Sequence, residues 1–274
     1  MATKADWQQQ TGKTWAENFV LTDRAFSNLT PALLEAFADI PCQSILDLGC
    51  GAGELSIAVA HSRPLATVIG LDISAELIAA AKTRGSTLSN LEFVVGDGAA
   101  WQMDCFSPDL VVSRHGVMFF DNPVGAFTHL SKMAAARAKL VFSCFRKPQL
   151  NSWASETGRL LQLPPPDDPF APGPFAFADQ ARVQGILSES GWQEINFAPI
   201  DFEFVIGGGV DPVADALNFL VTIGPAARAL AEMSDAQKDA AYRKLREWVS
   251  VLPNSDGRLS LPSAAWIVTA RNSS

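Results

Sequence analysis

The chain has 274 residues, of which 48% are hydrophobic and 18% are charged, and its formal net charge is −8. This length allows one large domain, or a core domain with an added cap. The acidic balance disfavours a nucleic-acid partner, because an acidic surface repels phosphate backbones. No apolar stretch approaches the roughly 20 residues of a membrane-spanning helix, and the start M-A-T-K-A-D-W lacks the apolar core of a signal peptide.

The four cysteines show no C-x-x-C spacing, so they indicate neither a zinc site nor a redox pair. We interpret them as reduced thiols, which places the protein in the cytoplasm. These cysteines are Cys42, Cys50, Cys105 and Cys144.

The chain begins with a helical stretch, residues 1–40, in which apolar residues recur at helical spacing. From residue 44 onward, short apolar or β-branched runs alternate with helical segments. This alternation predicts an α/β fold with a parallel sheet covered on both faces. The predicted strands are 44–48, 66–72, 91–95, 108–113 and 138–145, and the predicted helices are 54–61, 74–82 and 123–135.

The C-terminal half is less regular. The proline-rich stretch 163–175 excludes a helix or strand and predicts a rigid loop. Phe170, Phe175 and Phe177 either pack this loop over a pocket or only anchor it to the protein. Beyond it we predict a helix, a strand, two helical stretches and a closing strand. Their ranges are 178–192, 195–206, 211–250 and 263–271.

The stretch I-L-D-L-G-C-G-A-G-E-L, residues 45–55, places Gly49, Gly51 and Gly53 between a strand and a helix. Glycines there let the backbone turn tightly and let a ligand approach closely. Exposed N–H groups at a helix start favour an anionic group, and ligands of open α/β sheets bind beyond the carboxyl ends of the strands. The loop therefore predicts a nucleotide-like cofactor. The dinucleotide pattern G-x-G-x-x-G fails because its sixth position is Glu54, and no G-K-[ST] follows for a phosphate-binding loop.

The pattern D-x-G-x-G-x-G from Asp47 resembles motif I of the class I S-adenosylmethionine (SAM)-dependent methyltransferases. Acidic residues follow the next two strands in the order that this family shows. The resemblance implies that Asp72 accepts hydrogen bonds from both ribose hydroxyls, a task that suits an acceptor-only carboxylate. It implies that Asp97 accepts the adenine amine while the next backbone N–H binds a ring nitrogen. Backbone groups of Cys50, Ile73, Gly98 and Ala99 complete the cofactor site that it implies.

The segment S-R-H-G-V-M-F-F-D-N-P, from Ser113, resembles motif IV of the ubiquinone- and menaquinone-biosynthesis-type small-molecule methyltransferases. There Ser113 and Arg114 are expected to line the methionine end of the cofactor. The spacing W-x7-W, from Trp7 to Trp15, also resembles that group. The resemblance implies that these residues lie in a lid helix, with Trp15 near the cofactor. One departure is A-A-A-R-A at 134–138, where that family has Pro-Gly-Gly.

The resemblance implies a Rossmann-like seven-stranded sheet whose last strand is antiparallel and lies between the fifth and sixth strands, with a helical and loop cap. We divide the chain accordingly. The parts are an N-terminal helical lid, 1–40; a SAM-binding core, 41–150; the remaining core with the proline-rich loop and cap insertions, 151–262; and a final strand with the tail, 263–274.

Methyl transfer from a sulfonium needs an aligned nucleophile and little other chemistry from the protein. His115 is the candidate general base, because imidazole titrates near neutral pH; the alternative is a packing residue, since relatives carry an aromatic side chain there. Arg114 either binds the cofactor carboxylate or holds the pocket together. Asp121 and Asn122 precede Pro123 as a helix start does, so we expect no metal site.

The sequence thus predicts an enzyme that transfers a methyl group from SAM, leaving S-adenosylhomocysteine (SAH), to a small and partly hydrophobic acceptor. One alternative is a SAM-binding regulatory or partner subunit without turnover. Another is an NAD-dependent oxidoreductase, against which the missing sixth glycine argues. A third is an RNA methyltransferase, which the acidic charge and the absence of an N-P-P-Y-type motif disfavour.

Overall fold

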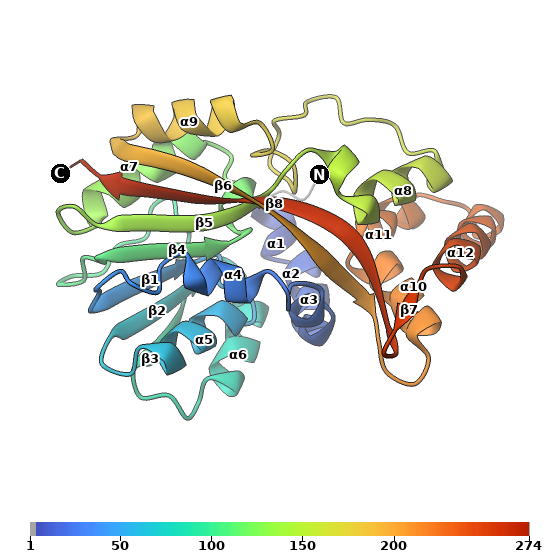
Figure 1. Ribbon diagram of the computed structural model, residues 1–274, viewed down its shortest axis with the longest axis horizontal. Coiled ribbons are helices and arrows are strands. Elements are labelled where there is room, and N and C mark those ends of the chain that lie inside the picture. The colour runs from blue at the N-terminus through green and yellow to red at the C-terminus, as the bar shows by residue number, and fades with distance from the viewer. Residues whose placement is uncertain (1–3, 274) are drawn as a thin grey trace.

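The computed structural model describes residues 4–273 and has one mixed sheet with strand order β3-β2-β1-β4-β5-β8-β6 (Figure 1). The first five strands are parallel, and β8 runs antiparallel between β5 and β6, as predicted. A two-residue strand, β7, pairs with β8 alone and adds to the seven expected strands. The strands are β1 Ser44–Leu48, β2 Thr67–Asp72, β3 Leu91–Val95, β4 Leu110–Arg114, β5 Lys139–Phe145, β6 Trp192–Gly207, β7 Asn254–Ser255 and β8 Arg258–Asn272.

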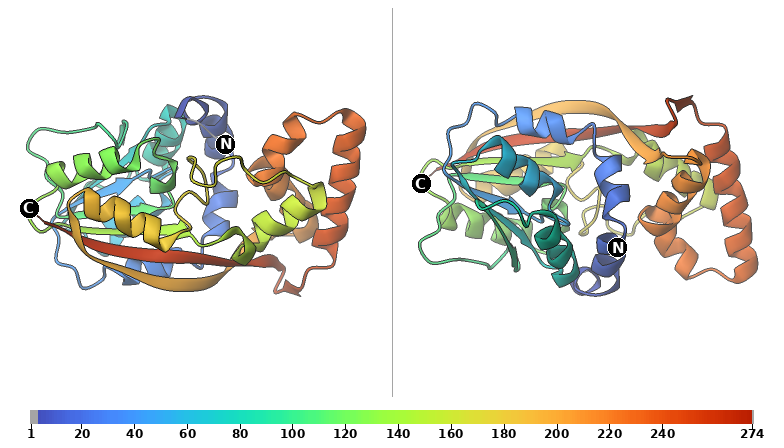
Figure 2. Two further views of the ribbon diagram at one scale, coloured as in Figure 1. Left: turned by 90° about the horizontal axis from the view of Figure 1, so that it is seen from above. Right: turned by 90° about the horizontal axis from the view of Figure 1, so that it is seen from below.

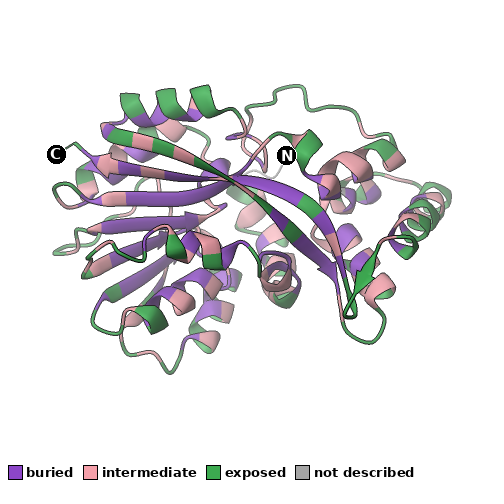
Figure 3. Cartoon of the chain, in the orientation of Figure 1, coloured by how far each residue is buried: buried purple, intermediate pink, exposed green. Residues whose placement is uncertain are grey.

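The central strands are buried on both faces, which explains their continuous apolar runs (Figure 3). Successive residues of β1 point to opposite faces, so Ile45 and Leu46 belong to different hydrophobic cores. The parallel register places the ends of β1 and β2 side by side, with Leu48 paired to Leu71. The motifs that follow these strands therefore meet at one edge of the sheet.

Helices cover both faces of the sheet. On one face lie α4, α5 and α6, and on the other lie α7 and α9. Ser74 caps α6 by accepting a hydrogen bond from the backbone of Leu77, as the sequence indicated. The bounds of these helices are α4 Thr30–Glu35, α5 Glu54–Ser62, α6 Ala75–Arg84, α7 Pro123–Met133 and α9 Gln180–Glu189.

The N-terminal segment is helical, as predicted, and lies between the sheet and the cap (Figure 2). Gly12 lets this segment pack closely on α6, because a Cβ at this position would lie 2.2 Å from the Trp7 carbonyl oxygen and 2.3 Å from Ser74 Oγ. Residues 1–3 of the predicted N-terminal part and Ser274 of the predicted tail lie outside the described residues. The helices are α1 Lys4–Trp7, α2 Gln10–Glu17 and α3 Phe19–Ala25.

The strands β6 and β8 extend far past the other strands and carry a helical cap at one end (Figures 1 and 2). The segment 211–250 contains three helices where two were predicted, because Gly224 and Pro225 interrupt the first stretch and Ser234 begins a new helix with a capping box. The helix α8 was not predicted. The cap helices are α8 Ser152–Leu161, α10 Pro212–Thr222, α11 Pro225–Ala231 and α12 Asp235–Ser250, and two 3-10 turns are η1 Val117–Phe119 and η2 Pro148–Leu150.

The proline-rich loop 163–175 has no helix or strand, as predicted. Its aromatic residues do not gather over one pocket. Phe175 does pack against Trp153 and Phe145, with ring centroids 5.6 and 5.9 Å away. Phe170, by contrast, is 45% exposed and lies beneath the guanidinium of Arg182, and Phe177, just beyond the loop, is buried against Phe127 and Phe142. Among the described residues, no helix combines the length and apolar character that a bilayer-crossing segment requires.

The turn before β5, where the sequence departs from Pro-Gly-Gly, is built around Arg137. This residue has φ +62°, a left-handed conformation that glycine adopts without strain. Ala138 closes the turn by donating its N–H to the Ala135 carbonyl at 3.0 Å. The glycine-like turn is therefore kept by a residue with a side chain.

Candidate functional site

The glycine loop after β1 is held against the end of β2. Gly49 and Cys50 donate their N–H groups to the Leu71 carbonyl at 2.8 and 3.0 Å. Gly49 has φ +67° and lies so close to Gly116 that a Cβ at position 49 would be 2.9 Å from its Cα. The loop thus touches the segment after β4, which carries the second sequence motif.

Asp72 stands at the end of β2 and is bound by backbone N–H groups on both oxygens. Oδ2 accepts from Gly51 and Oδ1 accepts from Ser74, each at 2.9 Å. Burial raises the pKa of this carboxyl, while its hydrogen bonds lower it. Each carboxylate oxygen has two acceptor sites, so both retain capacity for a further donor.

Asp47 is fully buried at the end of β1. Ser56 donates its hydroxyl to Oδ2 at 2.5 Å, and Oδ1 has no partner among the described residues. Burial raises the pKa of Asp47 to about 7, against a smaller opposing effect of the Ser56 hydrogen bond. Near neutral pH this carboxyl therefore exists in both protonation states.

Asp97 follows β3 and is less buried. Its Oδ1 accepts the N–H of Ala99 at 3.0 Å, and its Oδ2 lies 2.6 Å from Lys4 Nζ. Partial burial raises the pKa of Asp97, but the Lys4 ammonium and the Ala99 N–H more than offset this effect and leave the pKa lowered. The carboxylate is therefore ionised at neutral pH.

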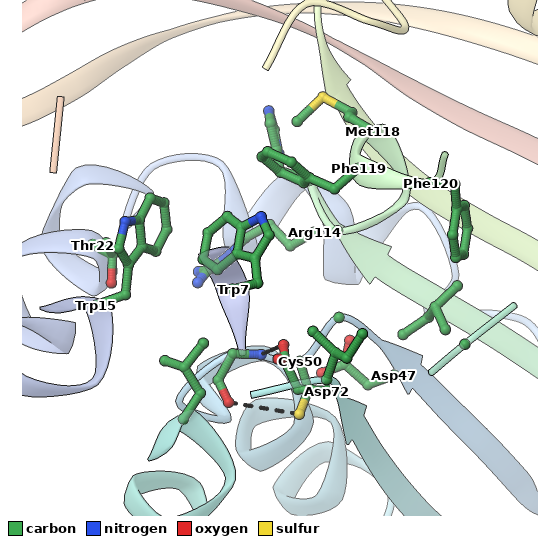
Figure 4. A pocket seen from close by; sticks show the side chains of 18 of the residues that line it. Trp7, Trp15, Thr22, Asp47, Cys50, Asp72, Arg114, Met118, Phe119 and Phe120 are labelled. Atoms are coloured by element: carbon green, nitrogen blue, oxygen red, sulfur yellow. Dashed lines mark hydrogen bonds between the residues drawn. The ribbon is translucent and has the colours of Figure 1, made fainter. Parts of the chain in front are cut away.

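These residues line one cavity of about 550 Å³ at the carboxyl ends of the strands (Figure 4). Trp7 lies across this cavity from Asp72 and Cys50. The Trp7 ring packs edge-on against the rings of Trp15 and Phe119, with a centroid distance of 5.1 Å in each pair. The N-terminal segment thus forms one wall of the cavity.

The side chain of Arg114 binds other side chains of the protein. Its Nη1 lies 2.5 Å from Glu54 Oε2 and 2.8 Å from Thr30 Oγ1, and its guanidinium lies 4.9 Å from the Phe26 ring centroid. This arrangement favours the second of the two roles considered for Arg114, that of holding the pocket together. Charge-assisted bonds of this kind are among the stronger ones in proteins.

His115 is 6% exposed and has φ +62°, an uncommon conformation for a residue with a side chain. Its backbone N–H donates to the Ser143 carbonyl at 3.1 Å, and its Nδ1 lies 2.8 Å from Ser143 Oγ. Its Nε2 has no partner among the described residues. Burial, with Arg114 nearby, holds the pKa of His115 well below its usual range, so the imidazole is neutral at physiological pH.

Aromatic side chains from five separate elements or loops form the other end of the cavity. Successive ring centroids lie 5.0 to 6.3 Å apart, and the His115 ring packs 4.1 Å from one of them. We call this set the ring cluster: it consists of Phe26, Phe145, Trp153, Phe204 and Phe219, all of which line the cavity.

Most of the site residues expected from the sequence line this cavity together. Gly53 and Ser113 do not. Gly53 packs against Phe93, where a Cβ would lie 2.6 Å from the ring, and Ser113 donates its hydroxyl to the Leu48 carbonyl at 2.7 Å. The expected residues that line the cavity are Trp15, Asp47, Gly49, Cys50, Gly51, Asp72, Ile73, Asp97, Gly98, Ala99, Arg114 and His115.

Several lining residues escaped the sequence analysis, among them Lys4, Asp23, Glu54 and the whole ring cluster. Glu54 was noticed only as the residue that breaks the dinucleotide pattern. The ring cluster gave no sequence signal, because its members are spread from residue 26 to residue 219 and share no spacing.

Comparison with known proteins matches residues 45–137 to a family described as a methyltransferase domain. A malonyl-[acyl-carrier protein] O-methyltransferase of Ilyobacter polytropus is 31% identical over 104 residues, 38% of this chain and 40% of that protein. A trans-aconitate 2-methyltransferase of Deinococcus radiodurans is 46% identical over 57 residues, 21% of each. The similar segments thus span less than half of these two relatives. A malonyl-[acyl-carrier protein] O-methyltransferase of Anoxybacillus flavithermus is 26% identical over 195 residues, 66% of this chain and 73% of that protein.

Two solved structures show the same fold. The YcgJ protein of Bacillus subtilis superimposes with a TM-score of 0.58 at 16% sequence identity, and the alignment covers 90% of this chain and 99% of the YcgJ chain. Phosphoethanolamine N-methyltransferase 2 of Haemonchus contortus, solved in complex with SAM, superimposes with a TM-score of 0.57 at 15% sequence identity. The alignment covers 100% of this chain and 61% of that chain. The predicted methyltransferase fold is confirmed.

Proposed function

We propose that the protein is a class I SAM-dependent methyltransferase, built on the methyltransferase domain that residues 45–137 match, and that it transfers a methyl group from SAM to a small, partly hydrophobic acceptor. The observation that carries the proposal is the single cavity that joins the motif residues after β1, β2 and β3 to the ring cluster. The names of the relatives, a malonyl-[acyl-carrier protein] O-methyltransferase and a trans-aconitate 2-methyltransferase, support methyl transfer as the activity.

In this proposal the three carboxylates divide the recognition of the cofactor. Asp72 accepts the ribose hydroxyls, since both of its oxygens retain acceptor capacity. Asp97 accepts the adenine amine, supported by its position after β3 and its neighbour Ala99, whose N–H it already binds. Asp47, whose Oδ1 has no partner among the described residues, accepts the cofactor's ammonium group.

SAM, when bound, supplies an activated methyl group, so the protein's task is to align the acceptor and exclude water. The N-terminal helices act as a lid through Trp7 and Trp15. His115 is the general base of this proposal where the acceptor must lose a proton, because it lines the cavity and its Nε2 has no partner among the described residues. Burial, with Arg114 nearby, lowers the pKa of this imidazole and so makes it a weak base. Ser143 holds that ring through Nδ1.

The division into a lid, a core, a cap-bearing part and a final strand belongs to the same proposal. So do a small-molecule acceptor without a nucleic-acid partner and a cytoplasmic location. The acidic net charge supports the former, and four cysteines that are all free thiols support the latter.

Calorimetric titration with SAM and with SAH tests the cofactor assignment. Wild type should bind both, and Asp72→Asn should lose at least about tenfold in affinity, about 1.4 kcal/mol, because one acceptor oxygen becomes an amide. Asp201→Asn is the matched control, because this carboxylate is 83% exposed, pairs with Arg146 and does not line the cavity. Wild type that binds neither ligand contradicts the proposal.

Turnover is tested separately, by measuring SAH formed from SAM with a panel of small acceptors. Formation of SAH that depends on an acceptor supports the enzyme. A protein that binds SAM tightly but forms no SAH with any acceptor is instead the binding subunit without turnover. The missing sixth glycine and the methyltransferase fold disfavour the NAD-dependent alternative.

A further inference from the structure

Buried polar atoms without partners gather around the cavity. Most buried side-chain polar atoms in proteins have a hydrogen-bond partner, so each exception needs an explanation. Of the seven such atoms found among the described residues, four belong to residues that line the cavity: Trp7 Nε1, Asp47 Oδ1, His115 Nε2 and Trp153 Nε1. Two of them, His115 and Trp153, lie within the ring cluster or against it.

The charges around the cavity are unfavourable for an anionic acceptor. Acidic residues outnumber basic ones in its lining, and both basic residues are already paired, Lys4 with Asp97 and Arg114 with Glu54. An acceptor carboxylate would find no unpaired cation among the described lining residues, and burying it without a partner would be costly. An acceptor cation would gain little from the acids that the proposed cofactor leaves free, because Glu54 is paired with Arg114, Asp23 is paired with Arg84 and Asp121 is exposed. The charged lining residues are Lys4, Asp23, Asp47, Glu54, Asp72, Asp97, Arg114 and Asp121.

The ring cluster itself favours a flat apolar molecule. Trp153 is nearly parallel to Phe204, with an interplanar angle of 29° and centroids 5.6 Å apart, and both rings line the cavity. Aromatic rings bury large apolar areas and attract another ring through stacked or edge-on contacts. Arg114, a charged lining residue, places its guanidinium over the Phe26 ring of this cluster. Its positive charge is balanced by the ion pair with Glu54.

His115 supplies the polar recognition at this end. Its ring packs 4.1 Å from Phe145 and 5.1 Å from Phe26, and all three side chains line the cavity. Because Nδ1 is bound to Ser143, the nitrogen left for a ligand is Nε2. A neutral imidazole exchanges one hydrogen bond there with an uncharged protic group.

We propose that the acceptor is an uncharged molecule with a flat, apolar body and a hydroxyl group. This inference rests on the proposed methyl transfer. The ring cluster binds the body, and His115 Nε2 binds the hydroxyl. His115 and Trp153 are thus specificity-determining residues, whichever atom receives the methyl group.

Equilibrium dialysis of SAH-saturated protein at about pH 7 tests this with four compounds that share one ring system. They are 2-naphthol, naphthalene, 2-naphthoate and 2-naphthylmethylammonium. We expect 2-naphthol to bind at least about tenfold more tightly than the anion and the cation, and about fivefold more tightly than naphthalene. Equal or tighter binding of 2-naphthoate or of the ammonium compound would overturn the proposal.

The variant His115→Phe separates recognition from packing, because it keeps a ring at this position. It should bind 2-naphthol no better than naphthalene while its affinity for naphthalene stays within about twofold of wild type. His129→Phe is the control and should keep the preference for 2-naphthol, since its Nε2 contacts the Trp101 carbonyl and it does not line the cavity. A His115→Phe protein that still prefers 2-naphthol overturns the role of Nε2.

Failure of this inference is distinguishable from failure of the proposed function. If SAH does not bind to wild type, the cofactor assignment fails first. If SAH binds but none of the four compounds does, or the charged ones bind best, the methyltransferase proposal stands and the acceptor class is wrong. Should His115→Phe not fold, the comparison of the four compounds on wild type alone still decides the acceptor class.

Discussion

Lys4 Nζ lies 2.6 Å from Asp97 Oδ2 and so joins the first described helix to the residue that follows β3. Three residues further along the helix, Trp7 contacts Phe119 of the segment after β4. The helix α1 thus bridges two loops that follow different strands, and the four residues of these contacts all line the cavity. We infer that the ion pair helps to keep this wall closed.

Lys4→Met removes the charge and keeps most of the length of the side chain. Because the ion pair is partly exposed, its contribution should be modest, about 0.5–1 kcal/mol. We expect SAH to dissociate about two- to fivefold faster from the variant, and added salt to affect that rate less than in wild type. Stopped-flow tryptophan fluorescence measures both. Lys13→Met is the control, since Lys13 is exposed and pairs only weakly with Glu17; an unchanged rate in Lys4→Met contradicts the closing role.

The buried carboxyl of Asp47 should make stability depend on pH. Its pKa is about 7 in the folded protein and 3.8 in the reference state, so the folded protein holds this proton more tightly. Wild type therefore loses stability from this group as the pH rises from about 4 to about 8. Asp47→Asn cannot lose the proton, so its free energy of unfolding relative to wild type should improve by about 3 kcal/mol between pH 5 and pH 8. Urea unfolding at both pH values measures this, and a difference that is constant with pH contradicts it.

The close approach of Gly49 and Gly116 makes position 116 intolerant of a side chain. A Cβ there would lie 2.6 Å from the Leu48 carbonyl oxygen and 3.0 Å from Gly49 Cα, so backbone must move. Gly116→Ala should lower stability by about 1–3 kcal/mol and weaken SAH binding. Gly185→Ala is the matched control: no atom lies within 4 Å of its Cβ position inside α9, and it should stabilise by about 0.5–1 kcal/mol. Thermal unfolding and calorimetry compare the two, and equal stability changes would show that the contact is unimportant.

Arg137 pays a conformational cost that glycine would not. Its φ of +62° disfavours a residue with a side chain by about 1 kcal/mol, part of which is offset by the larger freedom of glycine in the unfolded chain. Arg137→Gly should therefore stabilise the protein by about 0.5 kcal/mol. The neighbouring substitution Ala136→Gly, at a residue without positive φ, should destabilise it by a similar amount. Urea unfolding of both variants decides, and destabilisation by Arg137→Gly contradicts the argument.

Much of the fold was predictable because each strand and its following motif are local in sequence. The glycine loop from Gly49 and the acids Asp72 and Asp97 follow consecutive strands, and parallel pairing brings such positions to one edge. The antiparallel last strand came from the resemblance and is confirmed, whereas the finer subgroup that Ser113 and Arg114 suggested stays a prediction.

The acceptor end was not predictable in this way, because tertiary packing alone brings its residues together. The rings of Phe26 and Phe219 both pack against Phe204, although these residues lie far apart in the chain. No regular spacing in the sequence relates them. The partner of Arg114 was equally hidden, since Glu54 lies 60 residues away and its ion pair depends on how α5 leaves the glycine loop.

The paired strands β6 and β8 connect through a segment that contributes to the acceptor end of the site but contains none of the cofactor motifs. The chain leaves the sheet at Gly207 and returns beside it at Leu259, so α10, α11 and α12 all lie on one connection between these strands. One of these helices, α10, contributes Phe219 to the cavity, whereas the cofactor motifs lie within residues 45–137. Under the proposed function, exchange of the segment 208–257 between related proteins should therefore change acceptor choice through Phe219 while leaving the cofactor motifs unchanged, which makes this connection a place where an engineer can introduce a new specificity.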